Sequence, residues 1–199
     1  MQEFLYNATT PSLEGVIKAS IDKALYSKIN CVRVGIIEEF YPQTMTAKVN
    51  IANKMTTNTN FDGSQECIEY APIYSKVFTY TANQTGVIFP IQVGDEGILL
   101  FNDRELESWY LNGQINPISH LRCHHLSDSI FIVGLHSQPT IDLVQYIENC
   151  LHIYYGNSSI EIDSDSINAK ALNNIKLDAP NVEVTGNLNV KTGISAMVP

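Results

Sequence analysis

Apolar and polar residues alternate along most of this chain, and that period of two predicts β-strands rather than helices. One stretch near the N-terminus differs, because its apolar residues recur at intervals of three and four and predict an amphipathic helix of about four turns. Thr10 would cap this helix and Pro11 would occupy its first position. The apolar face of the helix comprises Leu13, Val16, Ile17, Ile21, Ala24 and Leu25. This face either packs on the chain's own domain or docks on a partner, and both roles stay open.

Short strands are predicted in quick succession between residues 31 and 137. The strand segments read CVRVGIIEEF, MTAKVNIA, CIEYAPIY, GVIFPIQV, ILLF and DSIFIVGL. Pro72 interrupts the third segment and indicates an edge strand or a bulge, and the turn GDEG joins the fourth segment to the fifth. Residues 52–66 are rich in Asn, Asp, Thr and Ser, which predicts a polar loop. Five or so strands with one helix fit a Greek-key barrel of the OB-fold type better than a sandwich, which needs about seven strands.

Residues 160–193 contain no aromatic residue and repeat one short strand followed by one turn. The paired apolar positions are Ile160/Ile162, Ile167/Ala169, Ile175/Leu177, Val182/Val184 and Leu188/Val190. Such a repeat is typical of a β-solenoid or β-helix. Burial of about ten side chains would not offset the entropy lost in ordering about forty residues, and the strand edges need partners. We therefore expect three copies of the chain to wind around one axis as a trimer.

The composition is that of an ordinary globular protein, with 44% hydrophobic residues and a formal net charge of −9. An acidic chain without clusters of Lys and Arg does not neutralise phosphates, so we expect no nucleic-acid partner. No run of eighteen apolar residues predicts a membrane-spanning helix, and the N-terminus lacks the pattern of a signal peptide. The four cysteines lie far apart without a CxxC pair and are expected to be reduced and buried, as in a protein made in a cytosol.

The densest group of chemically versatile side chains lies in the segment HLRCHHLSDSIF, residues 120–131. His120, Cys123, His124 and His125 are all potential metal ligands, but zinc sites usually take their ligands from two separated pairs. His124 and His125 are adjacent, so their side chains would point to opposite sides of an extended segment. We therefore expect the His120–His125 cluster to bind no metal, and we expect no other cofactor.

Motifs of hydrolases and nucleotide-binding enzymes are absent, since the chain has no GxSxG, HExxH or GxxxxGK[ST]. Ser127 and Asp128 lie beside the histidines, but three residues along one strand do not form a catalytic triad. Glu38 and Glu39 are expected to lie at a solvated strand end. We therefore predict no catalytic residue and no enzymatic activity.

The segment NDRELESW, residues 102–109, is expected to form a helical turn with one polar side and one inward-facing apolar side. The polar side would consist of Asp103, Glu105 and Glu107, and the apolar side of Leu106, Trp109 and Tyr110. Trp109 would belong to the core, or it would anchor an interface.

Residues 86–135 resemble the N-terminal domain of the central baseplate spike proteins of contractile-tailed phages. In that family a segment FP…GDxGLLLF precedes R…W…G and then R.H.LSDAxFIPGL. The matching residues here are Phe89-Pro90, Gly94 to Phe101, Arg104, Trp109, Gly113, Arg122, His124 or His125, Leu126-Ser127-Asp128 and Ile130 to Leu135. The phrase GNLNVKTG near the C-terminus is also similar to sequences common in β-helical phage spikes.

Together these observations predict a mainly β protein with an N-terminal helix, an OB-fold-like Greek-key barrel and a C-terminal triple-stranded β-helix formed by a trimer. The expected parts are an N-terminal segment (1–30), the barrel domain (31–137), a connector (138–155) and a short intertwined spike (156–199). The resemblance implies a structural role in a contractile tail baseplate. A homotrimeric central spike would attach to the tail hub and help to pierce the host cell envelope mechanically.

The resemblance also implies where this spike resides and what it meets. It would be assembled in the host cytoplasm, reside in the baseplate of the virion, bind a hub protein above and touch the host outer membrane transiently. The repeat is short, and the HxH motif with which some spikes bind iron at their apex is absent. The chain would therefore make a stubby spike capped by a separate tip protein, or the hub-proximal part of a two-protein needle. The alternative function is a trimeric OB-fold module that recognises a glycan or peptide, with the solenoid as its trimerisation stalk.

Overall fold

The computed structural model describes residues 12–59 and 65–191. It divides into two compact units, Met1–Ile141 and Asp142–Pro199, which are described separately below. Helix α1 (Leu13–Lys28) opens the first unit, as predicted, and the Ser12 hydroxyl caps it by accepting a hydrogen bond from the Gly15 N–H at 3.1 Å. The cap thus lies at Ser12, and the helix begins at Leu13. Thr10, the predicted cap, and Pro11, the predicted first helical residue, fall outside the described residues.

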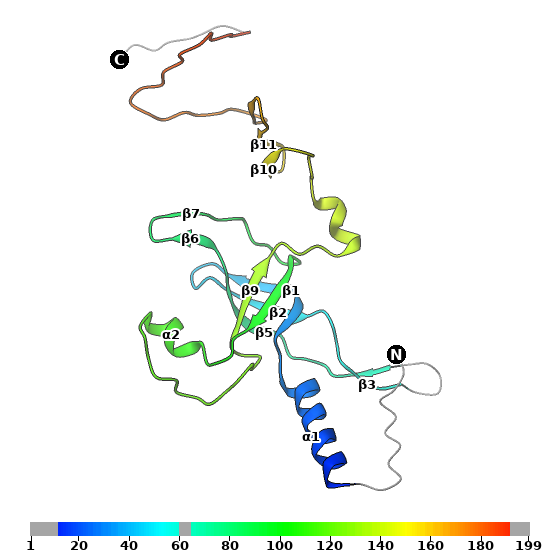
Figure 1. Ribbon diagram of the computed structural model, residues 1–199. Coiled ribbons are helices and arrows are strands. Elements are labelled where there is room, and N and C mark those ends of the chain that lie inside the picture. The colour runs from blue at the N-terminus through cyan, green and yellow to red at the C-terminus, as the bar shows by residue number, and fades with distance from the viewer. Residues whose placement is uncertain (1–11, 60–64, 192–199) are drawn as a thin grey trace. The chain divides into compact units, whose positions relative to one another are not determined.

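Five strands close into a barrel in the order β1-β2-β5-β9-β8 (Figure 1). They are β1 (Val32–Tyr41), β2 (Thr46–Ile51), β5 (Ile73–Val77), β8 (Glu96–Phe101) and β9 (Ser129–Val133). Neighbouring strands are antiparallel except β5 and β9, which run parallel. The series β8-β1-β2-β5 places the fourth strand beside the first, which is the Greek-key arrangement. The predictions of a mainly β chain and of a small closed barrel are confirmed.

The barrel interior is apolar because alternate residues of each strand point inward. In β8 every second residue is buried, and in β5 the outward residues alternate with buried Ile73, Ser75 and Val77. The buried core comprises Ile37, Ala47, Val49, Ile51, Ile73, Val77, Leu99, Phe101 and Phe131. The apolar residues that recur at every second position in the sequence therefore form this buried core.

Two hairpins outside the barrel were not predicted as such. The expected polar loop 52–66 contains β3 (Thr56–Thr59) paired with β4 (Gln65–Cys67), so its polarity indicates solvent exposure rather than absence of strands. The expected strand GVIFPIQV is also wrong, because only its first residues belong to a strand. That strand, β7 (Thr85–Val87), pairs with β6 (Tyr80–Ala82) in a short arm that extends from the barrel (Figure 1).

Prolines explain two of the strand boundaries. Pro72 directly precedes β5, so the predicted strand CIEYAPIY is split, with β4 ending at Cys67 and β5 beginning at Ile73. Pro90 lies in the segment between β7 and β8, where the sequence pattern GVIFPIQV predicts a continuous strand. Proline has no N–H to donate to a ladder, so both sites interrupt pairing.

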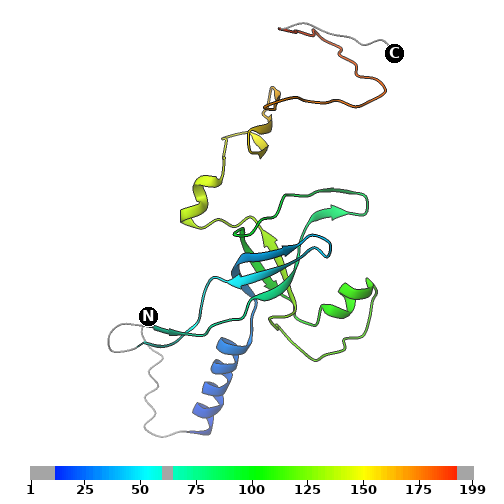
Figure 2. The same cartoon turned by 180° about the vertical axis from the view of Figure 1, so that it is seen from behind.

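A long loop joins β8 to β9 and carries the short helix α2 (Glu107–Asn112), as Figure 2 shows from behind. Gly113 ends α2 in the left-handed region, at φ 68°, and donates its N–H to the Trp109 carbonyl. After β9, the 3-10 helix η1 (Gln138–Leu143) leads into the second unit.

The second unit is a three-stranded antiparallel meander of β10 (Leu151–Tyr155), β11 (Ser158–Ile162) and β12 (Ile167–Lys170). The first two strand-and-turn units of the predicted repeat therefore form strands, whereas residues 171–191 contain neither helix nor strand. The trimeric β-helix stays a prediction. Within residues 12–59 and 65–191, no helix has the length and apolar character needed to span a bilayer.

Candidate interaction surfaces

The loop that carries the histidine cluster is organised by two carboxylates. Asp128 is buried and accepts two hydrogen bonds from the Arg122 guanidinium, at 3.0 and 3.1 Å, and one from the Leu106 N–H at 3.1 Å. The hydrogen bonds with Asp128 raise the pKa of Arg122. This ion pair joins the start and the end of the loop, because Arg122 and Asp128 lie just before β9 and Leu106 lies just before α2.

Glu105 is the second carboxylate. It accepts hydrogen bonds from the backbone N–H and the hydroxyl of both Ser108 and Ser119, at 2.6 to 2.9 Å, and from the His120 N–H at 3.1 Å. Hydrogen bonds from the Ser108 and Ser119 hydroxyls, with the backbone donors of the same residues, hold the pKa of Glu105 well below its ordinary value. Both carboxylates therefore shape the loop.

The four predicted ligand candidates each contact a different neighbour. The Cys123 thiol lies against the Arg104 guanidinium, and the His124 Nε2 lies 3.5 Å from an Asp103 oxygen. The His125 Nδ1 lies 3.0 Å from the Ser127 hydroxyl, and His120 contributes its backbone N–H to Glu105. Among the residues that the structure describes, no three His, Cys, Asp or Glu side chains gather as a potential metal site.

The remaining sequence candidates are separated as well. Asp128 is engaged by Arg122, whereas the Ser127 hydroxyl contacts His125, so the three residues do not line up as a triad. Glu38 forms a salt bridge with Lys48 at 2.6 Å, which lowers the pKa of Glu38, and Glu39 raises the pKa of Tyr41 by hydrogen bonding.

Two expectations about burial were wrong. Of the three apolar side chains predicted to face inward, Leu106 is buried, but Trp109 is 56% exposed and Tyr110 lies at the surface, where its hydroxyl donates to the Thr44 carbonyl at 2.7 Å. The core role of Trp109 is thereby excluded, and its alternative role as an interface anchor stays a prediction. The four cysteines are free, but none is buried, because none lies on a strand of the barrel.

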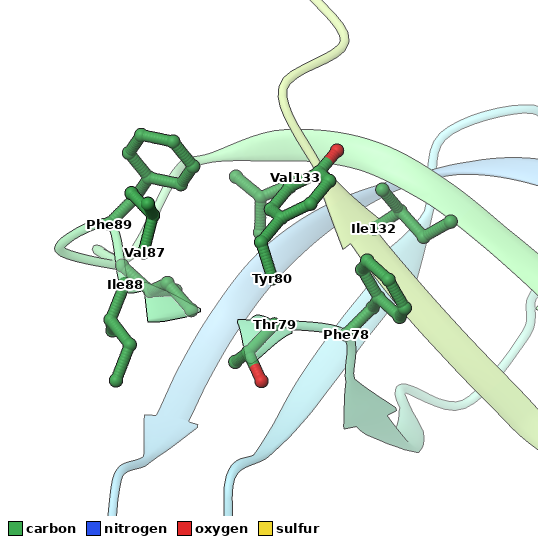
Figure 3. A pocket seen from close by; sticks show the side chains of 9 residues that line it. Phe78, Thr79, Tyr80, Val87, Ile88, Phe89, Ile132 and Val133 are labelled. Atoms are coloured by element: carbon green, nitrogen blue, oxygen red, sulfur yellow. The ribbon is translucent and has the colours of Figure 1, made fainter. Parts of the chain in front are cut away.

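An aromatic cluster that was not predicted from the sequence lies at the base of the β6–β7 arm (Figure 3). The Tyr80 ring meets the Phe78 ring edge-on at a centroid distance of 5.2 Å and the Phe89 ring at 6.2 Å. All three rings are about half exposed, and the lining is completed by Thr79, Val87, Ile88, Ile91, Ile132 and Val133. The barrel positions the cluster, because the Phe78 N–H donates to the Phe131 carbonyl and so continues the β5–β9 pairing by one residue. The β6–β7 hairpin could have been expected from Asn83 and Gln84, because Asn is common in the short turns that join hairpin strands.

Helix α1 presents a second exposed apolar surface. Leu13, Ile17 and Ile21 recur every fourth residue on one side of the helix, and each is at least half exposed. The predicted members Ala24 and Leu25 lie in the part of the helix whose side chains are outside the description.

The meander of the second unit has one apolar and one polar face. In its register Leu151 lies opposite Ile162, which lies opposite Ile167, and Ile153, Ile160 and Ala169 form the next row. Successive residues of a strand point to opposite faces, so these six side chains and Tyr155 share one face, which we call the apolar face. The opposite face carries His152, Tyr154, Ser159, Glu161, Asn168 and Lys170.

Comparison with known protein families identifies the family to which the barrel is similar. Residues 34–134 match the family described as the phage protein Gp138 N-terminal domain. The match covers 101 of the 199 residues and extends from the third residue of β1 to the residue after β9, so it corresponds to the barrel. No curated protein matches the chain.

Proposed function

Because the chain belongs to the family of the phage protein Gp138 N-terminal domain, we propose that it is a structural protein of the virion and forms the homotrimeric central spike of a contractile-tail baseplate. The barrel would attach to the tail hub. The C-terminal residues of three chains would wind into a short triple-stranded β-helix that helps to pierce the host cell envelope.

The observation that carries this proposal is the exposure of the C-terminal unit. Between residues 151 and 190 every large apolar side chain except Ile162 is exposed in the single chain, with Ile167 at 72% and Leu172 at 73%. Large contiguous apolar surfaces are rare on monomeric proteins and mark contact surfaces. Three interlocked copies would cover this surface and pair the backbone of residues 171–191, which forms no strand in the single chain.

The proposed work is mechanical rather than chemical. Contraction of the tail sheath would supply the energy, and the spike would need only stiffness, which cross-chain strand pairing provides. We therefore assign no catalytic residue and no cofactor, and we place the protein in the baseplate after assembly in the host cytoplasm. The hub above, a tip protein below and the host outer membrane are its proposed contacts.

The first experiment is the mass of the purified full-length chain by light scattering coupled to size exclusion. A mass near three times 22.2 kDa supports the proposal, whereas a mass near 22.2 kDa at micromolar concentration contradicts it. Gold-labelled antibodies on intact particles then test the position. Labels at the distal end of the tail are expected, and labels confined to the head or to the side of the tail would overturn the baseplate assignment.

A further inference from the structure

We propose that the apolar face of the meander is itself a surface on which copies of this chain meet, so that the trimer contact begins at Leu151 in β10 and not only in the later repeat. This inference rests on the proposed trimer and deepens it, because it names the contact residues and the orientation of the sheet. The polar face would point outward to solvent.

The apolar face needs a cover that the described residues of the second unit do not give it. Leu151, Ile153 and Ile167 are 60%, 51% and 72% exposed, although each has an apolar neighbour on the adjacent strand. A sheet that is hydrophobic on one face must bury that face against another element.

The polar face already has a neighbour, which identifies the face that is left open. The Gln145 N–H donates to the Tyr154 hydroxyl at 3.1 Å, and the Gln145 carbonyl lies 3.1 Å from the His152 Nδ1. The His152 ring stacks on the Tyr154 ring at 4.6 Å and its side chain is only 9% exposed. The segment before β10 therefore folds over the polar face, and a partner remains to be found only for the opposite one.

Charge favours a second copy as that partner. The chain carries a net charge of −9, so identical copies repel each other wherever their acidic residues face. The apolar face contains no charged residue, and the charged residues of the meander strands, Glu161 and Lys170, lie on the other side. Copies can therefore approach through this face without placing like charges together.

Sequence continuity also favours identical copies over a foreign protein. After Lys170 the alternation of apolar residues continues to Val190, but these residues form no strand pairs within the described chain. Identical chains carry identical repeats, so the strands of one copy have the same length and spacing as those of the next and can pair in register.

The test compares two pairs of substitutions on opposite faces of the same sheet. Ile153→Thr with Ile160→Thr alters a cross-strand pair on the apolar face, and Ser159→Thr with Lys170→Thr alters a cross-strand pair on the polar face. Threonine favours strands and is smaller and more polar than isoleucine, so both variants should keep the sheet. The full-length proteins are compared by sedimentation over a concentration series at one sub-denaturing guanidinium concentration.

We expect the apolar-face variant to dissociate at concentrations at least about tenfold higher than wild type, because six buried isoleucines are replaced per trimer. The polar-face variant should dissociate like wild type. Circular dichroism and the emission of Trp109, the single tryptophan, check that the barrel is folded in each protein.

Three other outcomes of this test would contradict the proposed interface or the proposed trimer. A trimeric wild type whose two variants dissociate alike would reject this interface and leave the proposed spike standing. Loss of stability in the apolar-face variant without any change in association would show that the face packs within a single chain and would reject this interface. A monomeric wild type would reject the trimer itself, and with it both proposals.

Discussion

Gly35 of β1 and Gly97 of β8 lie directly opposite each other in the antiparallel ladder, and the buried Phe131 ring occupies the space beside both. The Phe131 Cζ would lie 2.6 Å from a Cβ on Gly97, and its Cε2 would lie 3.1 Å from a Cβ on Gly35. The Phe131 ring thus has room because two facing residues, one on each of two neighbouring strands, lack side chains.

The two glycines predict different responses to alanine. A Cβ on Gly97 would collide with the Ile132 backbone carbonyl, which no rotamer change can move, so Gly97→Ala should lower the free energy of unfolding by about 3 kcal/mol. A Cβ on Gly35 meets only side chains, first the Val49 Cγ1 at 2.5 Å, so Gly35→Ala should lower it by about 1 to 2 kcal/mol. Guanidinium unfolding followed by circular dichroism measures both values.

The contact with Val49 supplies the control for this pair. In a Val49→Ala background, Gly35→Ala should have a clearly smaller effect than in wild type, whereas the effect of Gly97→Ala should persist. Equal effects of Gly35→Ala in both backgrounds would show that side-chain crowding is not its cause.

The buried ion pair of the long loop predicts a second loss of stability. Asp128→Asn keeps the side-chain size but removes the charge that faces Arg122, so we expect a loss of about 2 kcal/mol. Glu107→Gln is the matched control, because Glu107 lies 3.8 Å from the same guanidinium but is 58% exposed, and it should change nothing measurable. Equal unfolding midpoints for the two variants would mean that burial of Asp128 does not matter.

The barrel could be predicted from the sequence because each of its strands buries one face. In β2 the residues Ala47, Val49 and Ile51 face the core and alternate with polar residues, and this alternation is visible in the letters TAKVNI. The arm β6–β7 could not be predicted in this way, since all six of its strand residues are exposed and no apolar alternation marks them. Short strands without a buried face carry too weak a signal.

The interaction surfaces were less predictable, because they depend on tertiary placement. The histidine-rich segment suggested a chemical role, but its main structural contact is the ion pair of Arg122 and Asp128. Asp128 also binds the Leu106 N–H, and Leu106 lies sixteen residues or more away from both in sequence. Similarly, Phe78 and Phe89 lie on separate segments, and only the β6–β7 hairpin brings both against Tyr80.

Helix α2 offers a direct comparison of a buried and an exposed apolar side chain. Leu106 is 7% exposed and Trp109 is 56% exposed, although both were expected to face inward. Leu106→Ala should therefore lower the free energy of unfolding of the barrel by about 2 to 3 kcal/mol, and Trp109→Ala should change it by less than about 0.5 kcal/mol. Circular dichroism follows both variants. A loss at Trp109 as large as that at Leu106 would indicate that a partner chain covers the indole.

Glu105 predicts a dependence of stability on pH. Its pKa in the folded protein is lowered by the hydrogen bonds from Ser108 and Ser119, so its contribution is full above its ordinary pKa of 4.5 and is lost as the pH falls toward the folded value. The difference in Tm between wild type and Glu105→Gln should therefore be largest at pH 6 to 7 and shrink steadily below about pH 4.5. Ser119→Ala, which removes one hydroxyl donor but keeps the carboxylate, should give an intermediate difference. A Tm difference that is the same at pH 3 and pH 7 would show that Glu105 acts through packing and not through its charge.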